Sequence, residues 1–417
     1  MEIFAANFEA AADFMGADEG SLSGDGFHAQ VVKNEFLIRH ELVLPQSLLG
    51  ALNPHAGMFH LTRTRVAAPL AWLILLLVVP VHFLVSMGQL SVMSSATLSL
   101  FSVDASAVGR PGEVALSLAL AAVTLWLVLS RGYERMQRVM TALMVVMLLC
   151  FVLVALRGLG EWPSILAGLV PALPADLPLA GGASREATTS IIAMVGSAIA
   201  PAALLGLPYM SADAGGGRTD LAESLRQSVL NLGVIFGAYA TLVLVAGAYA
   251  LHVLPGHASF SDIVQAADVF RAVLPGVLAP LGPFIFTLGL FTAAMTTLVV
   301  AVQVTIYFLL DMAGRPWRFT LANRLFARAL GIFMLGAAAL APLWEFPALL
   351  KVILLMGINV VVMPAVYVVV LVLSNRRAVM QGNTNGPLRN LLLLAGLGAS
   401  LGLAVHKVPQ YWALLTG

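Results

Sequence analysis

The chain of 417 residues is strongly apolar, since 60% of its residues are hydrophobic, 10% are charged and its mean hydropathy is +0.93. A soluble domain carries roughly a quarter charged residues, so this composition excludes an ordinary soluble protein and predicts an all-α, polytopic bundle in a lipid bilayer. The formal net charge of +1 gives no strong field toward nucleic acid, and we expect no nucleic-acid partner.

The N-terminal region is too polar to cross a bilayer. Its first 26 residues contain six acidic residues and neither Lys nor Arg. A secretory signal needs a basic start and an apolar core, so this class of segment is excluded. We predict a polar cytoplasmic tail over residues 1–65, partly disordered, followed by a transmembrane domain over residues 66–417.

Nine apolar segments follow the tail, and each is long enough for a membrane helix or nearly so. They cover residues 67–100, 112–130, 138–157, 188–211, 227–252, 277–310, 328–343, 348–373 and 390–409. The first and sixth exceed the thickness of a bilayer, so we expect each to extend beyond the membrane or to contain a break.

Basic residues in the connections orient these segments, because cytoplasmic loops retain Lys and Arg. Every second connection is rich in arginine, beginning with the one before the first segment. This regularity predicts a cytoplasmic N-terminus and a multi-pass protein of the cell (inner or cytoplasmic) membrane. The residues concerned are Arg63, Arg65, Arg131, Arg135, Arg138, Arg218, Arg226, Arg315, Arg318, Arg324, Arg328, Arg376, Arg377 and Arg389.

The fourth segment is interrupted by Pro201 and Pro208. Proline provides no backbone donor and clashes with the carbonyl four residues earlier, so carbonyls near Ser197 and Leu204 lose their helical partners. Such a helix either carries a simple proline kink or lines a substrate site, as interrupted helices of transporters do. The residues alone favour the kink.

Few polar side chains fall inside the segments. His82 is the one ionisable group well inside a predicted span, whereas Asp311 and Lys351 fall at span ends. An ionisable group within a membrane suggests a function, here a proton relay. The alternative, which the pattern favours, is a histidine that hydrogen-bonds a neighbouring helix.

Several short motifs follow one another in a collinear order that is more specific than any one of them. In chain order they are Tyr133-Glu134-Arg135, the loop over 168–174, Val195 to Pro201, Gly289 to Thr297, Asn359 with Pro364, and Asn375-Arg376-Arg377 with Met380. Together they resemble the NRAMP family of proton-coupled divalent-metal transporters, which have a LeuT-type fold. The resemblance covers about residues 131–389 and is weaker from residue 67. It makes the nine segments the family's third to eleventh helices.

The resemblance implies a substrate site where the fourth, sixth and eighth segments meet. Its substrate would be a divalent cation, either of the Mn or Fe type or a harder ion such as Mg, with protons as the coupling ion. The residues that would line it are Ala200, Pro201, Ala202, Gln303, Met356 and Asn359. No resident cofactor is expected.

The sequence also departs from the family pattern. The first two family helices and their Asp-Pro-Gly-Asn motif have no counterpart, and the Met-Pro-His of the sixth family helix is replaced by Ala200-Pro201-Ala202. The second family histidine falls at Leu207, and the family's tenth-helix glutamine falls at Met356. The loss of thioether and imidazole donors disfavours a soft transition metal.

Two functions from different classes remain open at this point. One is a secondary transporter; the other is a non-transporting or degenerate membrane subunit or scaffold that needs a partner chain. Three explanations are open for the first two family helices, which have no counterpart here. The chain starts further upstream, a partner chain supplies these helices, or this protein is a degenerate relative of the family. An enzyme is not expected, because no nucleophile–base pair, acid pair or metal cluster lies within or beside the spans and no loop is long enough for a soluble catalytic domain. An ATP-driven pump is not expected either, because the sequence has no GxxxxGK[ST] loop.

Overall fold

The computed structural model describes residues 49–50, 52–53, 55–130, 201–213, 276–320, 322–344 and 348–416. It also describes scattered positions within 142–185 and 241–274. Within these residues the fold is helical, apart from two short antiparallel strands. Strand β1 (Leu177–Pro178) pairs with β2 (Ser184–Arg185). The predicted all-α bundle is confirmed.

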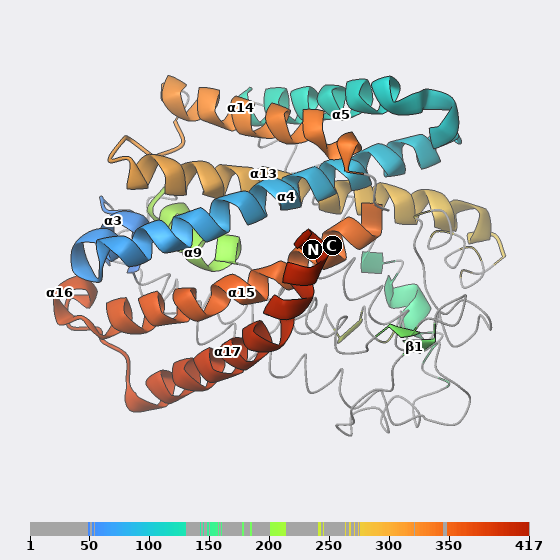
Figure 1. Cartoon of the computed structure of the whole chain (residues 1–417). Coiled ribbons are helices and arrows are strands. Elements are labelled where there is room, and N and C mark those ends of the chain that lie inside the picture. The colour runs from blue at the N-terminus through green and yellow to red at the C-terminus, as the bar shows by residue number, and fades with distance from the viewer. Residues whose placement is uncertain are drawn as a thin grey trace.

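Six long helices build the bundle, which is arranged in layers (Figure 1). They are α4 (Ala68–Leu100), α5 (Ala105–Leu129), α13 (Gly282–Met312), α14 (Arg324–Leu340), α15 (Ala348–Asn375) and α17 (Pro387–Thr416). Helices α4 and α13 cross the middle, α5 and α14 pack together on one side, and α15 and α17 pack together on the other. The central position of α4 follows from its contacts with α13, α15, α5 and α14.

All six helices are long and apolar enough to cross a membrane. Helix α4 has 33 residues and α13 has 31. At a rise of about 1.5 Å per residue they are roughly 45–50 Å long, well beyond a hydrocarbon core of about 30 Å. Neither is broken, although Pro80 lies inside α4. The extension expected for the first and sixth segments is therefore present without a break.

The remaining predicted segments lie largely outside the described residues. This applies to those over 138–157, 188–211 and 227–252, of which only α9 (Pro201–Asp213) and scattered positions are described. The six described spans agree with six of the nine segments, and the total of nine stays a prediction.

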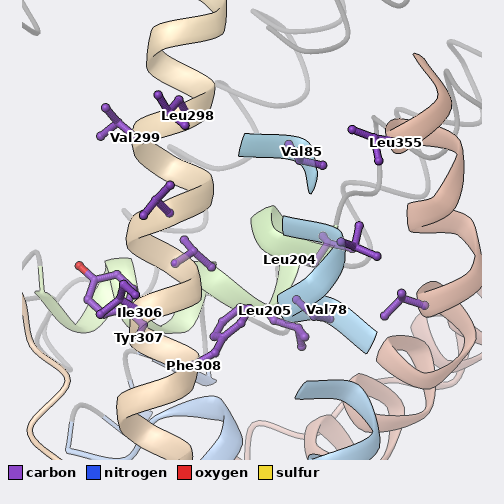
Figure 2. Packing of buried hydrophobic residues seen from close by; sticks show 14 of the residues in the cluster. Val78, Val85, Leu204, Leu205, Leu298, Val299, Ile306, Tyr307, Phe308 and Leu355 are labelled. Carbon is purple, nitrogen blue, oxygen red and sulfur yellow. The ribbon is translucent and has the colours of Figure 1, made fainter. Parts of the chain in front are cut away.

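The core of the bundle is a continuous apolar cluster centred on α13. Side chains from α4, α9, α13 and α15 all belong to this cluster (Figure 2). Val78 of α4, Leu205 of α9 and Leu355 of α15 are each no more than 1% exposed. Because α4, α13 and α15 bury residues around much of their circumference, they are the core helices of the bundle. Several leucines and valines of α17, and Val123 and Trp126 of α5, are exposed, as suits a face toward lipid.

Short elements close the two ends of the bundle. At one end, called the α3 end, lie α3 (Met58–Arg65), the C-terminal end of α13 and α16 (Arg377–Met380). At the opposite η5 end lie η5 (Ala341–Leu343), the connection from α4 to α5 and the N-terminal end of α15; η4 (Ala279–Leu281) precedes α13. Figure 1 shows α3 and α16 at the same end.

Helix α3 belongs to the stretch that the sequence assigns to a polar tail. Its residues Met58, Phe59, Leu61 and Thr62 are buried against the bundle. Residues before 49 lie outside the described part of the chain, so the rest of the predicted tail stays a prediction. The local sequence of α3 is polar, and its burial comes from contacts with distant parts of the chain rather than from an apolar stripe.

Candidate functional site

Helix α9 is the described half of the proline-interrupted segment, and it lies among the core helices toward the α3 end of the bundle (Figure 1). It contacts α3, α4, α13 and α15. A side chain at Gly206 would meet Val304 of α13 at 2.7 Å, so only glycine permits this close approach. Pro208 lies inside the helix and offers no N–H to the carbonyl of Leu204. The helix is thus tightly packed yet internally weakened.

The predicted site residues fall on three elements, of which α9 contacts the other two. Pro201 is buried on α9, Gln303 is half-buried on α13, and Asn359 is buried on α15. Ala200 lies outside the described residues, and Ala202 and Met356 are placed by their backbone on α9 and α15. Helix α9 contacts both α13 and α15. Over the described residues, no three His, Cys, Asp or Glu side chains gather as a metal-binding group.

Gln303 connects α13 to α9 through an aromatic pair. Its amide Nε2 donates to the hydroxyl of Tyr307, one turn further along α13, at 2.8 Å. The Tyr307 ring stacks on Tyr209 of α9, with centroids 5.5 Å apart and planes 2° from parallel. The edge of Trp317 packs against Tyr209 at 4.9 Å. This aromatic cluster fixes the lateral position of α9 against α13.

His82 lies buried between α4 and α13, and its hydrogen bonds define its tautomer. Nδ1 is 2.8 Å from the hydroxyl of Thr305. That hydroxyl donates its single hydrogen to the carbonyl of Ala301 at 2.7 Å, so it accepts from Nδ1–H. Nε2 then carries the lone pair, and it is buried without a hydrogen-bond partner among the described residues. The alternative drawn from the sequence, in which His82 forms a hydrogen bond with a neighbouring helix, is therefore present. The role of His82 as a proton relay stays a prediction.

A second polar group, to which the sequence alone did not assign a role, joins three elements at the α3 end. The Tyr209 hydroxyl donates to Asp311 Oδ2 at 2.6 Å and accepts from the backbone N–H of Phe59 at 3.0 Å. The backbone N–H of His60 also donates to Asp311 Oδ2, at 2.9 Å. Asp311 therefore acts as the acceptor for the first turn of α3. In the sequence, the one signal for this polar group was the carboxylate of Asp311 at the end of a long apolar run.

Lys351 is the buried charge of the η5 end. Its ammonium donates to the Ser91 hydroxyl at 3.0 Å and to the Ala341 carbonyl at 3.1 Å. It also lies 5.6 Å from the centre of the Trp344 ring, within the range of a cation–π contact. The sequence placed Lys351 at a span end, and the structure adds that only 4% of it is exposed.

Comparison with known proteins identifies the family of this bundle. The family model of the natural resistance-associated macrophage protein-like proteins, NRAMP, matches residues 49–409. The chain belongs to the NRAMP family. NRAMP proteins are transporters that act on divalent metal cations in membranes, so this chain is a multi-pass membrane protein of a transporter family rather than of an enzyme family.

Solved structures of an NRAMP-type protein share the fold. A manganese transporter of Eremococcus coleocola in complex with an aromatic bis-isothiourea substituted compound is 17% identical, with a TM-score of 0.66 over 98% of this chain and 85% of that one. A single-residue variant of that transporter is also 17% identical, with a TM-score of 0.68 over 100% of this chain and 86% of that one. At this identity the likeness shows the fold, which is LeuT-like. A search of curated proteins gives no match.

Proposed function

We propose that this NRAMP protein is a secondary transporter that moves a divalent metal cation across the membrane by alternating access. The observation that carries the proposal is family membership over residues 49–409. The position of the proline-containing α9 among the core helices supports it, because interrupted helices within a bundle are where such transporters bind substrate.

The proposed substrate site lies where α9 approaches α13 and α15. Backbone carbonyls near Ala200, Pro201 and Ala202 and the amide oxygens of Asn359 and Gln303 would supply oxygen ligands, with Met356 at the edge. Pro201 and Asn359 are both buried. Oxygen donors suit Mg²⁺ and Mn²⁺ better than soft metals. The substrate we propose is therefore a hard or borderline divalent cation that keeps part of its water shell.

Proton coupling is assigned to His82. A relay needs a group that can take up and release a proton near the moving helices. The Nε2 lone pair of His82 meets this need, since Thr305 fixes the ring through Nδ1 and leaves Nε2 as the acceptor. The α4–α13 interface that holds the ring also contacts α9.

We propose that the α3 end lies on the cytoplasmic side of the cell membrane. The basic residues of α3, of the connection from α13 to α14 and of the segment around α16 all belong to this end. They are Arg63, Arg65, Arg315, Arg318, Arg324, Arg328, Arg376, Arg377 and Arg389. The η5 end carries far fewer, among them Arg110 and Lys351. Cytoplasmic sides of membrane proteins carry this excess.

The test is uptake by purified protein in liposomes, comparing Mn²⁺ with Mg²⁺ under an inward proton gradient. We expect saturable uptake of at least one ion, and at least a tenfold loss for Asn359→Leu, which removes the amide at similar volume. Asn383→Leu, at an exposed position near α16, is the matched control and keeps wild-type uptake. Acidification of the lumen that follows uptake and is lost in His82→Gln supports coupling.

Flat uptake of both ions by folded, monodisperse protein would overturn the transport proposal. It would leave the non-transporting subunit as the better hypothesis. Metal uptake without proton movement would overturn the assignment of His82 alone.

A further inference from the structure

The α3 end contains a set of contacts that the proposed transport site does not use. Three short hydrogen bonds join the backbone of α3 to α9 and α13 through one hydroxyl and one carboxylate oxygen. The four residues concerned are Phe59, His60, Tyr209 and Asp311, and we name them the α3 latch. Tyr209 is fully buried and Asp311 is 5% exposed, so these bonds form away from water, where an unmade bond is costly.

Two glycines let α3 and the preceding residues reach this position. A side chain at Gly57 would collide with the Asp311 carboxylate and with the Tyr209 ring. A side chain at Gly50 would meet the Pro208 carbonyl at 2.5 Å. The chain before α3 and at its start therefore packs directly against α9. The contact lies at Pro208, which has no N–H to donate to the Leu204 carbonyl.

Further bonds hold the same segment from the other side. The amide of Asn53 donates to the Val379 carbonyl at 3.0 Å, and the amide of Gln381 donates to the Leu52 carbonyl at 2.7 Å. Arg63 donates to the Met312 carbonyl at 3.2 Å. Residues 49–65 are thus fixed to α13 and to the α16 region. The same segment forms the surface against which α9 packs at this end.

The contacts of α9 on this surface are few and specific. Close packing at Gly50 and Gly57 brings α9 against the chain before α3. The hydrogen bonds that tie α9 to Phe59 and to Asp311 both pass through the Tyr209 hydroxyl. A hydroxyl that donates to a carboxylate makes a charge-assisted bond, which is stronger than a neutral one. The Tyr209 hydroxyl therefore carries both of these hydrogen bonds between α9 and the α3 end.

We propose that Tyr209 and Asp311 are positioning residues that hold α9 closed at the α3 end, and that the α3 latch opens when α9 moves during transport. This proposal rests on the proposed function, because it gives the motion of α9 a role in the cycle. The residues do not touch the proposed cation site and act on it through α9. Loss of the hydroxyl shifts the population toward the state that is open at the α3 end.

Tyr209→Phe is the decisive variant, because it removes only the hydroxyl and keeps the ring contacts with Tyr307 and Trp317. Tyr367→Phe is its matched control. Tyr367 is also a buried tyrosine, 2% exposed, but its hydroxyl lies against Gly396 of α17 and takes no part in the α3 latch. Asp311→Asn is a second variant that keeps an acceptor but removes the charge.

The first measurement is backbone hydrogen exchange of the full chain in lipid nanodiscs, without metal. In Tyr209→Phe we expect exchange to rise about tenfold both over residues 57–61 and over 204–213, in keeping with the loss of one or two net hydrogen bonds. Asp311→Asn should give a smaller rise in the same two segments, and Tyr367→Phe none. An unchanged rate in α9, whether or not α3 exchanges faster, would overturn the proposal.

The second measurement separates positioning from plain stability. In intact cells we expect Tyr209→Phe to raise the apparent KM for metal uptake about five- to tenfold, because the outward binding state is less populated. Its melting temperature should fall below that of Tyr367→Phe, because the buried N–H of Phe59 loses its acceptor, so the KM is the deciding quantity. A lowered melting temperature with an unchanged KM would show a merely structural role and overturn the proposal. If no variant transports metal, the proposed function fails, and the exchange data still decide whether the latch holds α9.

Discussion

Among the described residues, each end of the bundle buries one charged side chain, but the partners of the two charges differ in kind. At the α3 end the Asp311 carboxylate accepts from a tyrosine hydroxyl and a backbone N–H. At the η5 end the Lys351 ammonium donates to a serine hydroxyl and a backbone carbonyl. The carboxylate joins α3, α9 and α13, of which α9 and α13 belong to the proposed site. The ammonium joins α4, η5 and α15, of which only α15 belongs to it. The first end is built around α9, and the second is not.

Polar groups at the η5 end and in the middle of the bundle share one device. Ser91 donates its own hydrogen to the Met87 carbonyl four residues earlier and accepts from Lys351. Thr305 does the same with the Ala301 carbonyl and His82. In each case the hydroxyl donates its hydrogen to a carbonyl of its own helix, so no donor is left unsatisfied. Its oxygen can then accept a hydrogen bond from the neighbouring helix. The α3 end is different because it uses backbone N–H groups from a helix start.

The largest effect is expected at the α3 end from Gly57→Ala. The added methyl group would meet the Asp311 carboxylate and the Tyr209 ring, so the latch must shift. Overpacking of this kind costs about 1–3 kcal/mol of folding free energy. The measurement is the apparent melting temperature in detergent. Gly386→Ala is the control, since it also precedes a helix but has open space around it. Equal melting temperatures for both variants would show that the α3 end accommodates the added methyl group without a loss of stability.

The long helices were predictable from sequence because their signal is local. The segment predicted over 348–373 agrees with α15, and the one over 67–100 agrees with α4 within a residue. A bilayer requires a run of apolar residues in each helix, so composition alone shows where each helix lies, although α5 begins at Ala105 rather than at the predicted residue 112. The small-residue stretch from Gly289 to Thr297 likewise falls on the buried part of α13.

The latch could not be predicted in this way. Phe59 and Tyr209 are 150 residues apart, and His60 and Asp311 are 251 apart. Nothing in the polar sequence of α3 indicates that it packs, because the groups it donates are backbone N–H groups that every residue other than proline has. Of the proposed site, Pro201, Gln303 and Asn359 were placed on helices that do meet. Their roles as ligands stay predictions.

Thr305→Val tests the middle of the bundle and should have the next largest effect. It removes the acceptor of His82 Nδ1 at similar volume and leaves a buried N–H unpaired, which costs about 1–3 kcal/mol. The matched control is Thr292→Val on the same helix. Its hydroxyl also donates to a carbonyl four residues earlier, that of Leu288, but it serves no histidine. Melting temperatures of the two variants should therefore differ, with Thr305→Val lower. Equal values would show that His82 does not depend on Thr305.

Ser91→Ala is expected to have a smaller effect at the η5 end. The Lys351 ammonium loses one acceptor but keeps the Ala341 carbonyl and the Trp344 ring, so the cost should be about 1 kcal/mol. Ser86→Ala on the same helix is the control, because the Ser86 hydroxyl donates to the His82 carbonyl in its own helix and not to Lys351. A larger loss of folding free energy for Ser91→Ala than for Thr305→Val would show that the η5 end depends more on its buried hydrogen bond than the middle of the bundle does.

The smallest effect concerns Asp104, an exposed residue that starts α5 at the η5 end. Its carboxylate accepts from the backbone N–H of Ser106 at 2.9 Å, and this bond, together with one to the Ser106 side chain, lowers the pKa of Asp104. A lowered pKa means that the charged form stabilises the fold. This contribution is complete above the unfolded pKa of about 3.9 and is lost as the pH falls through the lower folded value.

Asp104→Asn isolates this contribution, because asparagine caps a helix about as well but does not titrate. The melting temperature of the wild type minus that of the variant should be constant above about pH 5 and should fall below about pH 4, while all other carboxylates cancel in the difference. A difference that does not change with pH would show that the carboxylate has the same pKa in the folded and unfolded chain. The cap would then hold α5 by geometry alone, in contrast to the α3 end, where the charge of Asp311 is buried.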